Sequence, residues 1–167
     1  MNVGELLKLK GEIEFIRAVA EELREMIARM AVKVKASDPQ EELVPALALN
    51  LQRFYTAVED IIAHIARIFD QYNPAGPDWH RGLIQLAMVE TPLRPAVFGL
   101  ATARKLDKYR SFRHLLNRVS AEKIQWDKME GLVEEVPGTM EMVSSDLNGF
   151  LRFLDATVEK SLLNGGA

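Results

Sequence analysis

The sequence predicts an all-α protein, a bundle of four long helices with one or two short ones. Three observations support this prediction. Several segments repeat apolar residues at intervals of three and four, no segment shows sustained alternation of apolar and polar residues, and breaker clusters separate the periodic segments. Of the 167 residues, 48% are hydrophobic and 27% are charged, which is ordinary usage for a globular chain. We therefore expect one domain over residues 1–167.

The first helix is expected over about residues 4–36. Its apolar residues alternate in steps of three and four and form one stripe: Leu6, Leu9, Ile13, Ile16, Ala20, Leu23, Ile27, Met30 and Val34. This alternation is typical of left-handed helix packing. The helix should therefore lie nearly parallel or antiparallel to a neighbour.

A second helix should begin after residue 37. Asp38 is the expected N-cap, Pro39 the first helical residue, and Glu41 the partner that completes a capping box. Pro45 follows too closely to continue one helix. We therefore expect a short turn first, and then a long helix from about Pro45 to Asp70.

Breakers divide the rest of the chain into three helical stretches, expected at about 78–90, 101–119 and 128–163. The segments between them are two loops with several prolines, 72–77 and 91–95, and an irregular segment, 120–127. Pro137 and Gly138 are expected to break the last stretch near its start. The chain should end in a helix stop at 164–166.

Composition excludes several classes of protein and site. The chain has no cysteine, so disulfides, cysteine-ligated zinc and thiol catalysis are excluded. It has no Glu-x-x-His pair for a di-iron bundle and no glycine-rich phosphate loop, so we expect no metal and no cofactor. No apolar run reaches membrane-spanning length, and residues 1–10 do not read as a signal peptide. We expect a cytoplasmic protein that does not contact membranes.

A basic segment stands out against the net charge of −3. Residues 104–118 hold one acid, Asp107, and six basic residues: Arg104, Lys105, Lys108, Arg110, Arg113 and Arg118. Such a local concentration of positive charge can receive a phosphodiester backbone. The overall negative charge argues against non-specific binding of nucleic acid over the whole surface.

Within this helix, Arg110, His114 and Asn117 lie at i, i+4 and i+7, opposite the apolar side. Histidine transfers protons near neutral pH, and arginine binds phosphate oxygens through paired donors. In RNA cleavage the 2′-hydroxyl is the nucleophile, so this chemistry needs no metal. On these residues alone, a solvated basic face without catalytic function remains the commoner explanation.

Three residues outside this helix have alternative interpretations. Glu59 could pair with an arginine of the basic helix and orient the site, although a surface position is favoured. His64 lies at the edge of an apolar stripe and should be a hydrogen-bonded residue of the core or of its boundary. His80 should contact a partner or cap a short helix.

Several motifs resemble, in the same order, the HepT-like proteins of the HEPN superfamily. They lie at 47–55, 58–59, 79–80, 94–97, 106–114 and 132–134, and include Tyr-Arg-x-Phe-Arg-His at 109–114. The resemblance covers about residues 43–154. It implies a HEPN-like helical bundle that dimerises and places Arg and His of both protomers in a shared cleft.

The resemblance also implies a function. HepT-like members are typically toxin ribonucleases paired with a nucleotidyltransferase antitoxin that adenylylates a tyrosine near the site. Carried over, Arg110 would bind phosphate and His114 would transfer protons. Supporting or RNA-binding positions would be Arg113, Asn117, Arg118 and Glu59. The expected partners are RNA, the nucleotidyltransferase and a second copy of the chain.

The sequence departs from the family pattern at two points. The spacing of Arg110 and His114 is shorter than usual, and Ser120 stands at the expected tyrosine position, after Asn117-Arg118 in reversed order. We therefore expect no adenylylation beside His114. Two functions stay open: a metal-independent endoribonuclease, and a non-catalytic helical partner or regulator of a nucleotidyltransferase.

Overall fold

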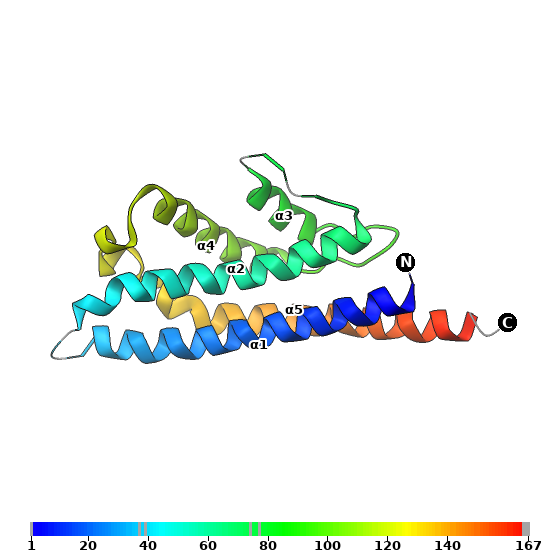
Figure 1. The fold of residues 1–167 in the computed structure, drawn as a ribbon, viewed down its shortest axis with the longest axis horizontal. Coiled ribbons are helices and arrows are strands. Elements are labelled where there is room, and N and C mark those ends of the chain that lie inside the picture. Colours follow the sequence, from blue (N-terminus) through cyan, green and yellow to red (C-terminus); the bar gives the residue numbers. More distant parts are fainter. Residues whose placement is uncertain (1, 37, 39, 74, 77, 165–167) are drawn as a thin grey trace.

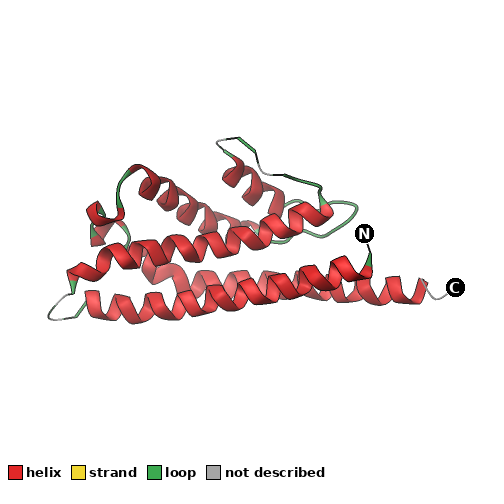
Figure 2. Ribbon diagram, viewed as in Figure 1, coloured by secondary structure: helices red, strands yellow, loops and turns green. Residues whose placement is uncertain are grey.

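The computed structural model describes residues 2–36, 38, 40–73, 75–76 and 78–164. In this part of the chain the α-helices are α1 (Val3–Val34), α2 (Val44–Phe69), α3 (Trp79–Ala87), α4 (Leu100–Arg118) and α5 (Glu130–Asn164) (Figure 1). No strand occurs among these residues (Figure 2). The predicted all-α bundle of four long helices and a short one is confirmed.

Helix α2 occupies the centre of the bundle. It packs against α1 on one side and against α3 and α4 on the other, and α5 packs against both α1 and α4. Helix α1 runs antiparallel to α2 and α5, so the two chain ends lie at the same end of the molecule (Figure 1). The stripe of α1 predicted a neighbour that lies nearly parallel or antiparallel, and this is confirmed with antiparallel neighbours.

The core forms where the apolar stripes of these helices meet. On α1 the stripe residues are buried except Ile16 and Met30, which are half-buried. Helix α2 contributes several large side chains that are almost fully buried, among them Leu47, Leu51, Phe54, Val58, Ile61 and Ile65. Truncating one such side chain to alanine usually costs about 2–5 kcal/mol. This packing fixes the position of α2 along its axis and its rotation about that axis. Helix α2 carries part of the site described below.

The start of α2 differs from one detail of the sequence prediction. The first turn is a 3-10 turn at Glu41–Leu43, and the residue before it, Gln40, makes no side-chain capping bond. The expected helix start at Asp38 is therefore wrong, and Pro39 lies outside the described residues. The expected turn followed by a helix from about Pro45 is confirmed, because Pro45 occupies the first turn of α2, where its missing N–H leaves no bond unmade.

The predicted break at Pro137 is wrong, because α5 is continuous from Glu130 to Asn164. A proline inside a helix costs about 3 kcal/mol. The neighbouring Val136 and Met140 are almost fully buried, and each such side chain contributes about 1.5–3 kcal/mol. Packing therefore offsets the lost hydrogen bond. The first turns of α5 lie at an angle to the rest of the helix (Figure 1), as expected for a proline kink.

The loop between α3 and α4 is held by a buried arginine. The Arg94 guanidinium donates to both carboxylate oxygens of Asp70, at 2.8–3.1 Å, and to the backbone carbonyls of Leu86, Val89 and Pro95. These bonds tie the end of α3 to the end of α2. The interruption predicted at 91–95 is thus a fixed connection that sets the position of α3.

Among the helices that the structure describes, none combines the length and the apolarity that a membrane span requires.

Candidate functional site

Helix α4 has the two faces that its sequence predicts. Leu106, Tyr109, Phe112 and Leu116 are buried in the core. His114, Asn117 and Arg118 are exposed, and Arg110 and Arg113 are partly buried between these two faces. Histidine and arginine side chains are therefore presented along one edge of the helix.

A cleft of about 390 Å³ lies between the start of α3 and this edge of α4. This volume is at the lower end of the range usual for ligand pockets, roughly 300–1,000 Å³. Four residues predicted from the sequence line it: Arg110, Arg113, His114 and Asn117. Glu59 and Arg118 are not among its lining residues. Helix α3 contributes His80 and Arg81 to the same cleft. The sequence predicted a partner contact or helix capping for His80, but Asp78 is the N-cap residue of α3, and Arg81 was not predicted as a site residue.

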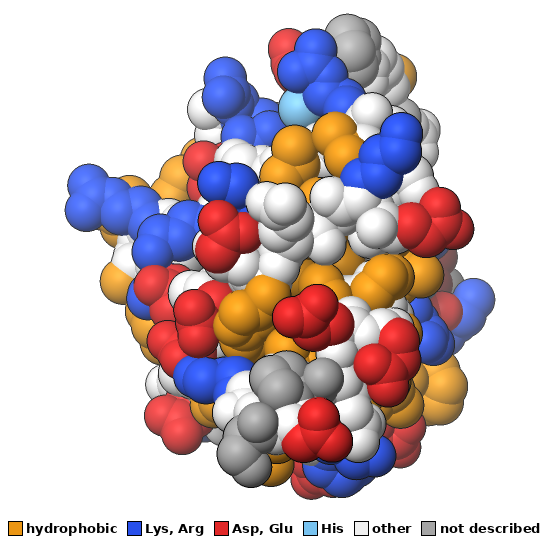
Figure 3. Space-filling view, turned by 90° about the vertical axis from the view of Figure 1, so that its left-hand side faces the viewer, with side chains coloured by type: hydrophobic (Ala, Val, Ile, Leu, Met, Phe, Trp, Pro, Cys, Tyr) orange, Lys and Arg blue, Asp and Glu red, His pale blue; other side chains and the backbone are white. Residues whose placement is uncertain are grey.

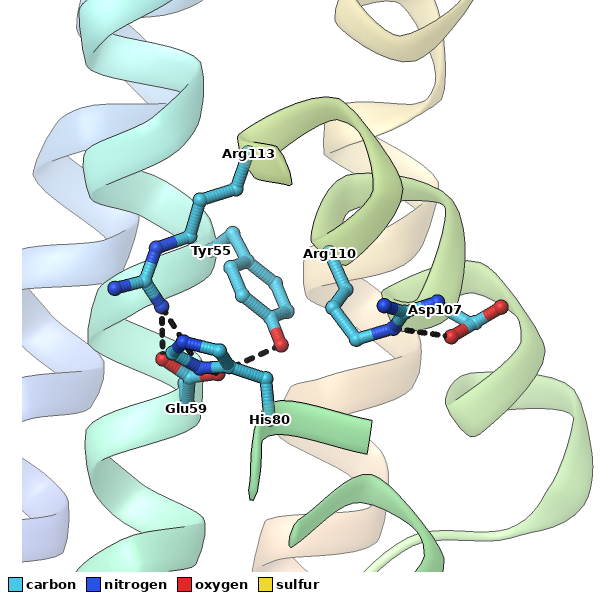
Figure 4. Close-up of polar contacts among 6 residues, drawn as sticks. All are labelled: Tyr55, Glu59, His80, Asp107, Arg110 and Arg113. Atoms are coloured by element: carbon cyan, nitrogen blue, oxygen red, sulfur yellow. Dashed lines mark hydrogen bonds and ion pairs between the residues drawn. The ribbon is translucent and has the colours of Figure 1, made fainter. Parts of the chain in front are cut away.

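Glu59 is buried beneath the cleft. Its side chain is 2% exposed, so the favoured surface position is wrong, and the alternative pairing with an arginine of the basic helix is correct. Arg113 Nη1 donates to Glu59 Oε2, the Tyr55 hydroxyl donates to Oε1 at 2.8 Å, and His80 Nδ1 lies 2.6 Å from Oε1 (Figure 4). Side chains of α2, α3 and α4 thus meet on one carboxylate.

These contacts explain how a carboxylate is accommodated inside the bundle. Burying an isolated charge is costly, and the cost falls when the charge is paired and hydrogen-bonded. Burial raises the pKa of the Tyr55 hydroxyl well above its ordinary value, and the negative charge of Glu59 raises it further. Tyr55 therefore stays protonated and remains a hydrogen-bond donor to Glu59.

Arg110 has a different environment. Its Nε donates to Asp107 Oδ1 at 2.6 Å, and its side chain is 17% exposed. In Figure 4 Arg110 points toward Asp107 while Arg113 points toward Glu59, so the two arginines leave α4 in different directions. Arg110 is pre-oriented at the cleft wall by an acid that is itself half-exposed and accessible to solvent.

A family model described as HepT-like protein matches residues 46–154. The chain belongs to this HEPN-type, HepT-like family. The matched region contains Glu59 and every residue that lines the cleft, whereas α1 lies outside it. The chain matches no curated protein and no solved structure.

The basic segment of this HepT-like chain is not one uniform basic face. Lys105 and Lys108 turn toward α5 and bind Glu135, with Nζ–Oε distances of 3.0 and 2.9 Å. Hydrogen bonds from Lys108 and then from Lys105 hold the pKa of Glu135 below its ordinary range. Of the six basic residues of this segment, Arg110 and Arg113 line the cleft. Figure 3 shows Lys and Arg side chains around a histidine at the upper end of the molecule, where α3 and α4 lie.

The third histidine, His64, lies on α2 and away from the cleft. His64 is half-buried on α2, its Nδ1 lies 2.7 Å from the Asp60 carbonyl oxygen, and its Nε2 lies 3.8 Å from Glu12. The sequence prediction of a boundary residue is confirmed. Within the described part of this HepT-like chain, no group of three or more His, Asp or Glu side chains is arranged to hold a metal ion.

Proposed function

We propose that this HepT-like protein is the toxin component of a toxin–antitoxin pair and cleaves RNA without a metal in the cleft between α3 and α4. One observation carries the proposal. His114 lines the same cleft as Arg81, Arg110 and Arg113. Guanidinium groups bind phosphate oxygens, and a histidine moves protons at neutral pH.

The reaction that fits these groups is an internal transesterification. The 2′-oxygen attacks the adjacent phosphorus, the O2′–P bond forms, and the P–O5′ bond breaks. The products are a 2′,3′-cyclic phosphate and a 5′-hydroxyl. Arg110 binds the phosphate and steadies the charge that builds on it, and His114 transfers a proton.

Other groups support the substrate. Arg113 and Asn117 offer donors inside the cleft. Arg118 is exposed on the last turn of α4, close along the helix to His114, where it can contact a neighbouring phosphate. Glu59 holds Arg113 in place from below.

We propose a two-fold homodimer as the active form, with a nucleotidyltransferase as the antitoxin. His114 and Asn117 are exposed on the protomer, so a second surface is needed to enclose an RNA strand against them. Sedimentation at micromolar concentrations should show a dimer. A monomer at every concentration would contradict this part of the proposal.

The test of the proposed function is a pair of substitutions on α4. His114→Ala should lower RNA cleavage by roughly a hundred- to ten-thousand-fold, the usual loss for a general acid or base. Folding should survive, because His114 is exposed and such changes seldom exceed about 0.5 kcal/mol. Arg110→Ala should weaken binding as well as turnover, and Arg110→Lys should restore only part of both. Arg152→Ala, which removes an exposed arginine of α5, is the matched control and should behave as wild type.

Two observations favour a non-catalytic partner or regulator of a nucleotidyltransferase as the second candidate. Arg110 is already paired with Asp107, and Ser120, at the position of the expected tyrosine, donates its hydroxyl hydrogen to Glu122. If this second function holds, His114→Ala leaves both RNA cleavage and growth inhibition unchanged while binding to the nucleotidyltransferase persists.

A further inference from the structure

We propose that His80 is a second proton-transfer residue of the cleft and that Glu59 positions it. The inference rests on the proposed function and extends it. It comes from one juxtaposition. His80 lines the same cleft as His114. Its ring is hydrogen-bonded to the buried Glu59 carboxylate of α2.

The contacts at Glu59 determine which ring nitrogen of His80 is engaged by the protein. The carboxylate takes hydrogen bonds from Tyr55 and Arg113, as expected for an ionised acceptor. His80 Nδ1 lies 2.6 Å from Oε1, a distance that requires a hydrogen between the two atoms. We therefore assign the hydrogen to Nδ1, which leaves Nε2 as the nitrogen that can exchange a proton with a ligand. Among the described residues, none forms a hydrogen bond with His80 Nε2.

The ring is also held in a fixed orientation. The Trp79 ring lies against it, with centroids 3.6 Å apart and planes 33° from each other. Arg113 Nη1 lies 3.1 Å from His80 Nδ1. Both nitrogens carry hydrogens and share the Glu59 carboxylate, so this distance reflects their common acceptor. Although Glu59 and Trp79 contact the ring, the His80 side chain keeps 22% of its surface exposed.

A second histidine completes the proton balance of RNA cleavage. One proton must leave the 2′-hydroxyl while the O2′–P bond forms, and one must reach the 5′-oxygen while the P–O5′ bond breaks. His80 Nε2 accepts the first proton, and His114, as an imidazolium, donates the second. The Glu59 carboxylate faces the positive charge that the His80 ring gains, in the way that a buried acid supports a catalytic histidine.

The first test separates proton transfer from a structural role. His80→Asn removes Nε2 but keeps an amide N–H that can donate to Glu59. Its kcat for RNA cleavage should fall by roughly a hundredfold or more, with little change in KM and an unchanged helical spectrum. The matched control is His64→Asn, which changes a half-buried histidine on α2 outside the cleft. It should keep the wild-type kcat.

The second test assigns the direction of transfer. The wild-type cleavage position in a short RNA is mapped, and the RNA is then synthesised with sulfur in place of the 5′-oxygen there. A thiolate leaves without being protonated, so the proton donor His114 is not needed. The loss of kcat caused by His114→Ala should therefore be smaller on this substrate. The loss caused by His80→Asn should persist, because the 2′-hydroxyl must still be deprotonated. The reverse pattern would overturn the role given to His80.

The third test concerns Glu59 as a positioning residue. Glu59→Gln should lower kcat in the wild-type background, measured per folded molecule. In the His80→Asn background it should cause a clearly smaller loss, because only its contact with Arg113 is then left to lose. Losses that multiply in the double variant would contradict action through His80.

The failures of the two proposals can be told apart. A wild-type protein that cleaves no RNA overturns both. A wild-type protein that cleaves RNA, loses activity in His114→Ala and keeps it in His80→Asn overturns only the role of His80.

Discussion

Replacing Glu59 by glutamine should destabilise the fold strongly, although the change removes only a charge. Glu59 is 2% exposed and accepts from Tyr55, His80 and Arg113. Glutamine keeps one oxygen for two of these donors, but directs an amide group at the Arg113 guanidinium. Breaking a buried ion pair from one side costs about 3–5 kcal/mol.

The lower end of that range applies here. Arg113 and His80 keep 21% and 22% of their side-chain surfaces exposed, so water screens part of the change. A loss of about 3 kcal/mol should lower Tm by about 6–12 °C in a chain of this size. The assay is thermal and urea unfolding followed by circular dichroism. Glu22→Gln, which neutralises an exposed acid of α1, is the control and should change stability by less than about 0.5 kcal/mol.

A paired substitution tests the reason for the loss. The double variant Glu59→Leu/Arg113→Met removes both charges, and it should be more stable than Glu59→Leu alone, because no unpaired charge remains. If Glu59→Gln stays within about 1 kcal/mol of wild type, the ion pair is screened as at a surface, and the reasoning is refuted.

Three further outcomes are expected. Arg94→Met should cost about 3–5 kcal/mol in urea unfolding, because Asp70 loses its buried partner; a loss below 1 kcal/mol would contradict this. Glu135→Gln should be less stable than wild type at pH 7, by at most about 1 kcal/mol. Because the pKa of folded Glu135 lies below its ordinary 4.5, that difference should disappear as the pH falls through the lowered value; a constant difference down to pH 3 would count against it. After co-expression with a nucleotidyltransferase, mass spectrometry should find no adenylate within residues 110–123 and none on Tyr109, which is 1% exposed and whose pKa burial raises to about 12.

The helices were predictable from the sequence because each depends on a local pattern. The stripe of α1 and the apolar face of α4 are periodicities within single segments, and both are confirmed. The error at Pro137 has a tertiary cause. Local propensity expects a break, but burial of Val136 and Met140 stabilises the continuous helix.

The candidate site was predictable to the extent that it lies on one helix. Arg110, His114 and Asn117 share an edge of α4 through their spacing alone, and the structure places all three in one cleft. The contacts of Glu59 with His80 and Arg113 join residues 21 and 54 positions apart, so no local pattern reveals them. One signal was present: an acid on a mostly apolar helix and an arginine on a basic helix can pair with each other when the helices pack.

RNA cleavage by the purified chain of residues 1–167 in excess EDTA, with analysis of the new ends, is the direct test of metal-independent cleavage by the 2′-oxygen. Cleavage should continue in chelator and should leave 2′,3′-cyclic phosphate and 5′-hydroxyl ends, because the nucleophile is the 2′-oxygen of the RNA. Replacing the 2′-hydroxyl at the mapped position by hydrogen should abolish cleavage there. Activity that disappears in EDTA and returns with magnesium or manganese, or products with 5′-phosphate ends, would contradict it.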